Sequence, residues 1–418
     1  MADFNTYRES LKKPFVKLCR LRFLNPDGST AFLLDNNPLR KSNKCFIANG
    51  NLSVNLQNGQ RRTANITLDN VDREFDYNVN HLWFGREVAI DEGLILQDGT
   101  EYYLQQGVFL LTRPAESIQP VGRTIEYNLV DKWANLDGTL YGNLEGTYEV
   151  ALNTDPFAAI GALLTEDKGN GQMLDYLPLV NGFVTWRNLP YTVTVDAEGT
   201  LAQVILAIVE TLAGLVGYDR SGHLRIDPSS DDIDDNTKPV QWTFKMEETS
   251  LLGLTYNIRN EDVFNDYIVV GEQLDNGVQP CARVQNLDPR SDTNIHLIGK
   301  KTKRESASGY ADVTQCLDLA TWRLKRATVL TKAVSVQASQ IFHIEENQLI
   351  EIVRSDKEGS PTEKHLVQGF SRPLASSGPM TISAISTVDI PDFTIVQDTS
   401  FATNSASEED TAEAEQGT

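Results

Sequence analysis

Histidine is the side chain that most often carries protons or binds metals near neutral pH, and this chain of 418 residues has five. They are His81, His223, His296, His343 and His365. None of them has metal-ligand spacing to another histidine or to a cysteine. His343 stands close to Glu345 and Glu346, and we interpret this segment as a solvated turn between two strands rather than as a site.

An acidic cluster offers the oxygen ligands that a hard cation such as Ca²⁺ prefers. Its members are Asp231, Asp232, Asp234 and Asp235. The cluster lacks the central glycine and the distal glutamate of a calcium-binding loop, so an acidic surface loop is the favoured interpretation. Two carboxylates ~5 to 9.5 Å apart would suit glycoside hydrolysis. Among 58 acidic residues such a pair can always be imagined, so the composition favours no particular residues for this chemistry.

Motifs of known catalytic and binding sites are missing from the sequence, including the nucleophile elbow, the Walker loop, the dinucleotide fingerprint, H-E-x-x-H and the EF-hand loop. The cysteines lack C-x-x-C spacing, which argues against a disulfide framework or a zinc ribbon and indicates reduced, mostly buried thiols. They are Cys19, Cys45, Cys281 and Cys316. We therefore assign no catalytic, cofactor-binding or metal-binding residue and expect no enzyme activity and no cofactor.

The large aromatic and basic side chains suggest contacts between elements or subunits. Tryptophans are spread singly, which favours core or interface anchors over a sugar-stacking platform. They stand at Trp83, Trp133, Trp186, Trp242 and Trp322. The compact basic groups are Arg61-Arg62 and Lys300 to Arg304, and we expect both at subunit contacts. A net charge of -21 argues against a surface that binds nucleic acid by neutralising phosphates.

The longest apolar stretch, Leu201 to Val216, contains Gln203, Glu210 and Thr211 and is shorter than the ~20 residues of a membrane span. We expect a soluble chain without stable membrane insertion. The first eighteen residues mix charges and lack the apolar region of a secretory signal. The sequence therefore predicts a protein that stays in the cytoplasm until something else exports it.

Short strands and tight turns dominate the first part of the chain. Between Asn49 and Thr112 apolar residues alternate with polar ones, which is typical of strands with one buried face. Asn58-Gly59 and Asp98-Gly99 provide hairpin turns, and Asn25 to Gly28 provides another. We predict an all-β domain over residues 1–132.

The remaining chain divides by composition into three further parts. Residues 133–250 read as a loop-rich insertion with a helix over 200–217 followed by a hairpin. Residues 251–391 read as a second strand-rich domain with a helix over 310–325. Residues 392–418, rich in Ser, Thr, Ala, Asp and Glu, predict a disordered acidic tail. The fold class is thus mainly β, of the α+β type.

Three segments give the chain a resemblance to the hub proteins of phage tail baseplates, including the trimeric hub of contractile-tailed phages. Gly50 to Thr112 resembles the first hub barrel, and the helix from Thr200 with "YDRSGHLRIDP" is similar to the helix and hairpin of that family. The block from Asn294 to "HLVQGFSRPLASSGPMTISAIS" resembles the second barrel. Many relatives have a Gly-Asp pair before the strand near Leu349, where this chain has Glu345-Glu346-Asn347-Gln348.

The resemblance implies a homotrimer in which two β-barrels from each subunit form a pseudo-sixfold ring. Such a ring joins the tail tube to the tip or spike, with distal tail proteins and the tape measure protein as further partners, and it lines the DNA ejection channel. An acidic lumen would let DNA slide without binding. The location implied is the baseplate of a virion tail assembled in the host cytoplasm, whether the tail is contractile or not.

Two alternatives stay open beside the hub. One is a tail-associated hydrolase that acts on cell-wall polysaccharide, for which the sequence offers no motif. The other is a non-catalytic adaptor at the tail tip that binds carbohydrate on the same β scaffold.

Overall fold

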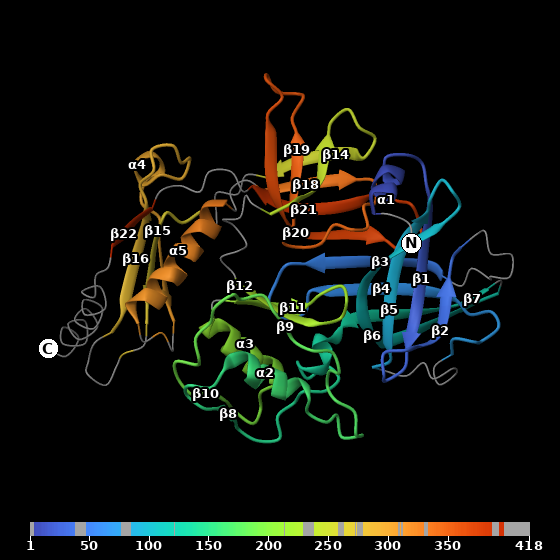
Figure 1. Cartoon of the computed structure of the whole chain (residues 1–418), viewed down its shortest axis with the longest axis horizontal. Helices are drawn as coiled ribbons and strands as arrows, with labels where there is room; N and C mark the ends of the chain where they lie inside the picture. Colours follow the sequence, from blue (N-terminus) through green and yellow to red (C-terminus); the bar gives the residue numbers. More distant parts are fainter. Residues whose placement is uncertain are drawn as a thin grey trace.

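The computed structural model describes the chain in segments, and Figure 1 shows their arrangement. The segments are residues 4–37, 47–76, 85–120, 122–212, 214–228, 238–257, 263–271, 273, 279–307, 310, 312–329, 333–386 and 393–396. The mainly β fold class is confirmed, because most of the elements in these segments are strands. In the described part of the chain, no helix combines the length and apolar character needed to cross a membrane.

The first β unit contains seven strands in the spatial order β3-β4-β7-β6-β5-β1-β2. They are β1 (Val16–Leu24), β2 (Thr30–Asp35), β3 (Ile47–Asn55), β4 (Arg62–Asp69), β5 (Glu87–Ile95), β6 (Glu101–Gln119) and β7 (Gly122–Asp131). The three predicted hairpins are confirmed, because β1 pairs with β2, β3 with β4, and β5 with β6. Gly28, Gly59 and Gly99 in their turns have positive φ, the region that favours glycine. A helix that the sequence did not suggest, α1 (Phe4–Leu11), precedes these strands.

The second β unit continues the same sheet. Its strands are β13 (Val240–Lys245), β14 (Leu251–Asn257), β18 (Ala333–Ala338), β19 (Leu349–Val353), β20 (Thr362–Pro373) and β21 (Met380–Ser386). β20 pairs with β3 of the first unit, so both units share one 13-stranded sheet and one large apolar core. In Figure 1 the strands from β18 through β20 and β3 to β4 are stacked one above the other.

The two units repeat one strand path. In the first unit the path runs β3-β4-β7-β6-β5, in the second β14-β18-β21-β20-β19, and every step is antiparallel. Leu111 of β6 and Val367 of β20 occupy equivalent places. The Leu111 N–H donates to the Arg86 carbonyl at 3.0 Å, and the Val367 N–H donates to the Gln348 carbonyl at 2.9 Å. Neighbouring strands keep the same register, since Leu111 faces Leu129 and Val367 faces Ala384.

The irregular positions of the two units coincide too. The ladder of β3 with β4 shifts register between Ile47 and Asn49, and the ladder of β14 with β18 shifts between Leu251 and Gly253. When the two units are aligned, Ile47 matches Leu251 and Asn49 matches Gly253. Before β5 and β19, Gly85 (φ 74°) and Asn347 (φ 59°) take the same left-handed conformation. Asn347 can make this turn because asparagine tolerates the left-handed region better than most residues with a side chain. The two units therefore match in strand pairing, register and backbone conformation, whereas the side chains at matching positions have little in common.

The insertion after β7 has its own apolar core. Its elements are η1 (Lys132–Asn135), β8 (Tyr148–Val150), α2 (Pro156–Leu164), β9 (Val180–Asn181), β10 (Val193–Val195), α3 (Leu201–Thr211), β11 (Gly214–Tyr218) and β12 (Leu224–Pro228). α3 begins at a capping box in which the Thr200 hydroxyl accepts from the Gln203 N–H. The predicted helix over 200–217 is wrong beyond Thr211, because the following residues pair with β12 as a strand. Helix α2 was not predicted within the loop-rich segment.

A separate four-stranded sheet with a helix lies to one side in Figure 1. Most of its elements stand between β14 and β18 in the sequence, and its last strand follows β21. Its elements are β15 (Asp266–Val270), β16 (Cys281–Asn286), α4 (Ile295–Ile298), β17 (Thr302–Ser306), α5 (Val313–Val329) and β22 (Phe393–Val396). The predicted helix over 310–325 is displaced, because the Asp312 side chain accepts from the Thr314 N–H and the helix begins at Val313. The prediction of a disordered tail from residue 392 is wrong for the first residues of the tail, because Phe393–Val396 pairs with β16. The rest of that tail lies outside the described residues.

Candidate functional site

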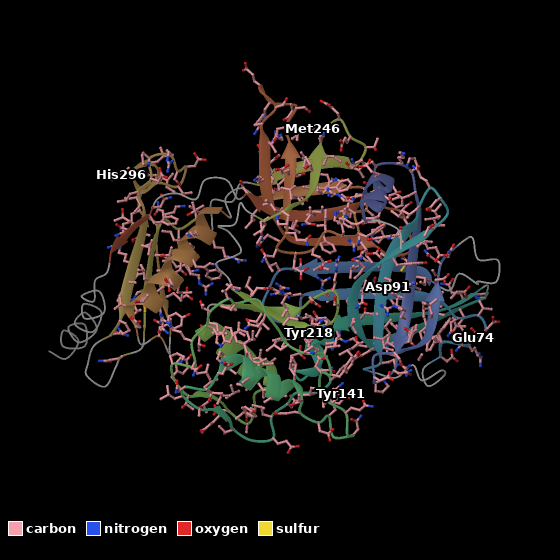
Figure 2. All side chains as sticks on the ribbon, viewed as in Figure 1. Glu74, Asp91, Tyr141, Tyr218, Met246 and His296 are labelled. Atoms are coloured by element: carbon pink, nitrogen blue, oxygen red, sulfur yellow. The ribbon has the colours of Figure 1, made fainter. Side chains whose placement is uncertain are left out.

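A cluster of buried charges lies where the first unit, the insertion and the second unit meet. Arg62 at the start of β4 is its centre, with a side chain only 1% exposed. Its Nη1 donates to the Gln106 carbonyl at 2.8 Å, and its Nε donates to the Tyr218 carbonyl at 3.3 Å. Its Nη2 contacts both Glu345 and Glu346, the second at 2.8 Å. One guanidinium therefore joins all three parts of the chain. Figure 2 places Tyr218 where the insertion meets the large sheet.

Asp131, at the end of β7, holds the backbone around Arg62. Its Oδ2 accepts the N–H groups of Arg61 and Arg62 at 2.8 and 2.9 Å, and its Oδ1 accepts the Trp133 N–H at 3.1 Å. Burial raises the pKa of Asp131 to about 6, although these hydrogen bonds act in the opposite direction. This carboxylate fixes the start of β4 relative to the insertion.

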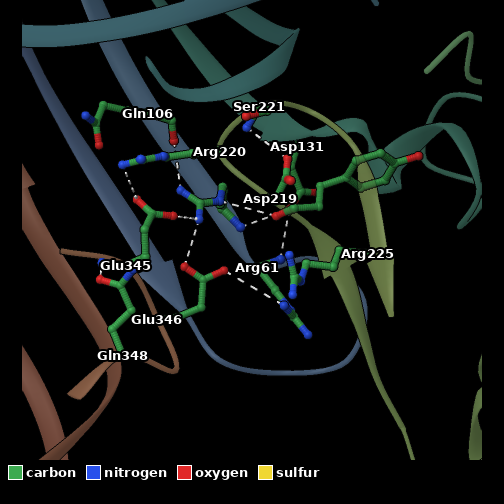
Figure 3. Close-up of polar contacts among 12 residues, drawn as sticks. Arg61, Gln106, Asp131, Asp219, Arg220, Ser221, Arg225, Glu345, Glu346 and Gln348 are labelled. Carbon is green, nitrogen blue, oxygen red and sulfur yellow. Dashed lines mark hydrogen bonds and ion pairs between the residues drawn. The ribbon is translucent and has the colours of Figure 1, made fainter. Parts of the chain in front are cut away.

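The interpretation of His343, Glu345 and Glu346 as a solvated turn is wrong. The His343 side chain is buried, with the Tyr7 hydroxyl 3.2 Å from Nδ1 and the Gln241 carbonyl 3.2 Å from Nε2. Burial lowers the pKa of His343 to about 4, so the ring is neutral at pH 7. Burial also raises the pKa of Glu345, while Arg62 opposes this effect. Figure 3 shows both glutamates directed toward the arginine side chains of the other two parts.

A second buried cluster joins side chains of β1, β5 and β20. Glu92 is fully buried and lies 2.8 Å from Nζ of Lys17 and 2.5 Å from Nε of Arg372. Burial acts to raise the pKa of Glu92, but Arg372 and Lys17 outweigh it and hold that pKa below its ordinary value. Nη2 of Arg372 also donates to the side chain of Gln106, whose carbonyl accepts from Arg62. Gln106 therefore connects the two clusters.

A third buried ion pair lies inside the insertion and joins its first residue to two of its loops. Lys132 and Asp175 contact each other with both side chains at 0% exposure, and the Lys132 ammonium also donates to the Gly222 carbonyl at 3.0 Å. Buried pairs of this kind contribute geometry more than stability, because desolvation offsets much of their attraction. The Arg62 and Glu92 clusters connect different parts of the chain, whereas the Lys132 pair connects elements of the insertion to one another.

A cavity of about 380 Å³ opens beside the Arg62 cluster. Its lining residues are Leu56, Arg61, Arg62, Leu215, Asp219, Arg220, Ser221, Arg225, Asp227, Lys238, Glu345, Glu346, Asn347 and Gln348. Its carboxylates face arginines, as in the pair of Arg225 and Asp227 at 2.7 Å and that of Arg220 and Glu345 at 3.9 Å. Within the described residues, no group of three or more His, Cys, Asp or Glu side chains is placed to hold a metal ion. The chemistry of this lining is ion pairing between parts of the chain.

No protein-family model and no curated protein matches the sequence, but solved structures match the fold. The tail protein from Neisseria meningitidis MC58 matches with a TM-score of 0.58 and 9% identity, over 88% of this chain and 96% of that chain. The 43 kDa tail protein of prophage MuSo2 from Shewanella oneidensis matches with a TM-score of 0.57 and 8% identity, over 88% and 98%. This chain has the fold of phage tail proteins. A chain of the Francisella PdpA-VgrG complex gives a TM-score of 0.50 with 9% identity, over 91% of this chain and 59% of that chain.

Within this tail-protein fold, the structure contradicts the expectation for the first basic group, whereas a subunit contact of the second stays a prediction. Arg61 and Arg62 were expected at subunit contacts, which is wrong, because both are buried inside the chain. The group from Lys300 to Arg304 lies at β17, where Nζ of Lys300 is 3.4 Å from Asp266. The burial of Asp266 acts to raise its pKa, and hydrogen bonds from Arg283 and Thr302 lower it below the ordinary value.

The other sequence candidates fall into three groups. Trp133 and Trp242 are core residues, while Trp186 is 42% exposed and donates to Asp155 at 3.1 Å. The cysteines of the described segments, Cys19, Cys281 and Cys316, are buried, as predicted. Candidates outside the described residues are His81, Trp83, Cys45 and the acidic cluster of Asp231, Asp232, Asp234 and Asp235.

No motif in the sequence points to Glu92, Arg372, Lys17 or the pair of Lys132 and Asp175. Their only local signal is a charged residue within an apolar strand pattern, as for Glu92 between the buried residues Ile90 and Leu94.

Proposed function

We propose that this chain is a structural component of the tail baseplate of a phage or of a phage-derived particle. In this proposal it is a hub that joins the tail tube to the tip or spike and lines the channel through which DNA is ejected. Its partners are other copies of itself, the tail tube and distal tail proteins, and the tip, spike or tape measure protein. It works in the virion tail after assembly in the host cytoplasm.

The repeated strand path carries this proposal. A hub must match a tube of sixfold symmetry to a tip of threefold symmetry, and three chains with two equivalent units each present six similar units. The shared register of β6 with β7 and of β20 with β21 makes the two units equivalent in backbone. The tail-protein fold adds support, and the first domain limit, at residue 132, belongs to the same proposal. The expected limits at residues 250 and 391 shift, because β13 (Val240–Lys245) pairs with β19 and Phe393–Val396 pairs with β16.

The net charge of -21 supports a passage for DNA rather than a site that holds it. The Asp and Glu side chains of the assembled ring would line the channel and repel the phosphate backbone. A channel lined mainly by Lys and Arg would contradict this part of the proposal.

Electron microscopy of the purified protein and of labelled tails tests the proposal. The expected result is a threefold ring with a central channel, with the label at the junction of tube and tip. A compact monomer with a deep cleft would overturn it. A lytic assay on purified cell walls tests the alternative of a polysaccharide hydrolase, and a label at the outermost tip would favour the carbohydrate-binding adaptor.

A further inference from the structure

We propose that β14 of one copy pairs with the outer end of β6 in the next copy, residues 113–119, in a register that the chain already uses internally. The inference rests on the proposed assembly of several copies, and it names the strands and residues that hold neighbouring copies together. The partner is a second copy of this chain, and the contact is an antiparallel β-ladder.

The template for this contact is the pairing of β20 with β3 inside the chain. Arg372 faces Leu52 and Pro373 faces Asn51 in this ladder. Its ends are fixed by the Leu374 N–H, which donates to the Gly50 carbonyl at 2.8 Å. This ladder joins the second unit to the first through the β20 residues that follow the bulge.

The repeat supplies equivalents for both strands of this ladder. β6 is the equivalent of β20, and Ala115 and Ser371 match because they face the matching residues Glu126 and Thr381. Counting from there, Ser117 is the equivalent of Pro373. β14 is the equivalent of β3, and both strands have the register shift at the same place. Counting from that shift, Tyr256 is the equivalent of Leu52 and Thr255 is the equivalent of Asn51.

Transferring the internal register gives three pairs between copies. They are Ala115 with Asn257, Glu116 with Tyr256, and Ser117 with Thr255. The Ile118 N–H, as the equivalent of the Leu374 N–H, would donate to the Leu254 carbonyl of the neighbouring copy.

The exposure of equivalent residues shows that these two edges lack the cover that the internal ladder has. Leu52 is 0% exposed, whereas its equivalent Tyr256 is 37% exposed. Leu374 after the end of β20 is 0% exposed, whereas its equivalent Ile118 near the end of β6 is 70% exposed. Leu252, at the shared register shift of β14, is 58% exposed. In the described residues, β14 pairs only with β18, and residues 113–119 pair only with β7.

The two edges belong to different surfaces of the chain, so the contact is heterologous and each copy leaves one edge of each kind for its neighbours. β14 ends the strand order on one side, and β6 lies four strands beyond β20 in that order. An exposed strand edge with apolar residues favours pairing with another chain. When the β20–β3 contact is repeated between copies as β6 with β14, every unit of the ring pairs with its neighbour through the same kind of antiparallel ladder.

A disulfide across the proposed ladder tests the register. Pro373 and Asn51 lie one residue away from the hydrogen-bonded pair of Leu374 and Gly50, so their equivalents form a non-hydrogen-bonded pair with Cα atoms ~4.5 Å apart. This spacing lies within the ~4.4 to 6.8 Å that disulfides accept. We expect the full chain with Ser117→Cys and Thr255→Cys to give covalently linked copies after mild oxidation, up to a species of three chains.

Matched variants distinguish the proposed pairing from other contacts. Ser117→Cys with Leu252→Cys moves one thiol three residues along β14, ~10 Å away, and should not cross-link. Each single variant alone should stay unlinked, because a heterologous contact brings unlike residues together. Mixing the two single variants should restore the link and thereby show that it joins different chains. A link in the Leu252→Cys variant or in a single variant would overturn the register.

A proline tests the ladder without thiols. Ile118→Pro removes the N–H that would donate to Leu254 of the next copy, at an edge with no partner strand among the described residues. We expect loss of the oligomer in solution while the circular dichroism spectrum stays that of the folded chain, whereas Ile118→Ala should keep the oligomer. The unfolding temperature should fall toward that of the separate chain, because association stabilises the folded state.

The combined outcomes separate this inference from the proposed function. A threefold ring that forms with Ile118→Pro and without the Ser117–Thr255 link would overturn the strand pairing and leave the hub standing. A chain that stays monomeric and unlinked at high concentration would overturn the pairing, while the imaging of tails decides the hub separately.

Discussion

Arg372 of β20 donates its Nε–H to the carboxylate of Glu92 of β5 at 2.5 Å, and neither side chain is exposed to solvent. The pair crosses the junction where β20 meets the first unit, so it connects the two halves of the large sheet. Because both charges are buried away from water, each one depends on the other for its electrostatic stabilisation.

Replacing Glu92 with glutamine is expected to destabilise the protein. Arg372 and Lys17 would keep their charges in a buried site without the carboxylate, which typically costs about 3–5 kcal/mol. Urea unfolding monitored by tryptophan fluorescence measures the loss. Glu9→Gln removes the exposed ion pair with Lys12 and should leave the curve unchanged. Equal unfolding midpoints for Glu92→Gln and the wild-type chain would contradict the assigned role.

Replacing Arg62 with methionine is expected to cost about 3 kcal/mol or more, because Glu345 and Glu346 lose their shared partner. Adding Glu345→Gln and Glu346→Gln to the same chain should recover part of the loss, since no buried carboxylate is then left unpaired. Arg225→Met is the matched control, because Arg225 is 45% exposed in its pair with Asp227. Failure of the triple variant to exceed Arg62→Met in stability would argue against the pairing.

His343 predicts a dependence of stability on pH. Its pKa falls from 6.5 to about 4 on folding, so between these values the unfolded chain binds more protons than the folded chain. The free energy of unfolding therefore decreases as the pH falls from about 6.5 to about 4, by about 3 kcal/mol from this residue.

Asp131 acts in the opposite direction over part of the same range, because its raised pKa makes the folded chain bind more protons below about pH 6. The difference between variants isolates His343. We expect His343→Asn to show a shallower loss of stability at acid pH than the wild-type chain. His296→Gln, at an exposed position, should keep the wild-type slope. Parallel curves for His343→Asn and wild type would contradict the prediction.

Gly217 in β11 has no room for a side chain. A Cβ atom there would lie 2.2 Å from Nε and 2.3 Å from Cδ of the buried Arg61. Gly217→Ala should therefore destabilise the chain by about 1–3 kcal/mol, as overpacking does. Gly161→Ala is the matched control, because nothing lies within 4 Å of a Cβ in this helical position. The control should raise stability by up to about 1 kcal/mol, and equal thermal midpoints for the two variants would refute the argument.

Local signals in the sequence were sufficient for the hairpins and insufficient for some boundaries. Asn58-Gly59 and Asp98-Gly99 determine their turns through the conformations that these residues adopt, without help from distant parts of the chain. Helix α3 was extended too far because Leu212 and Leu215 continue its apolar spacing. Pairing with β12 overrides that pattern after Thr211.

The charged junctions could not be predicted because their partners are remote in sequence. Arg62 and Glu346 are 284 residues apart, and nothing near either residue identifies the other. A pair of adjacent glutamates after a strand is typical of an exposed turn. Here the two glutamates are buried because three parts of the chain pack around them. The strand repeat was equally inaccessible, since Leu52 and Tyr256 match in hydrogen-bonding register and differ in type.

The separate sheet containing β15–β17 and α5 occupies a defined place in the repeat. In the first unit β3 and β4 are joined by a tight turn at Asn58-Gly59, whereas in the second unit residues 258–332 stand between the equivalent strands. The entry and exit of this segment are adjacent, because Asn257 and Ala333 face each other in the ladder. The sheet is completed from outside this segment, since β22 follows β21 in the chain and pairs with β16. The second unit therefore holds this sheet by three connections, two at the tip of the β14–β18 hairpin and one after β21.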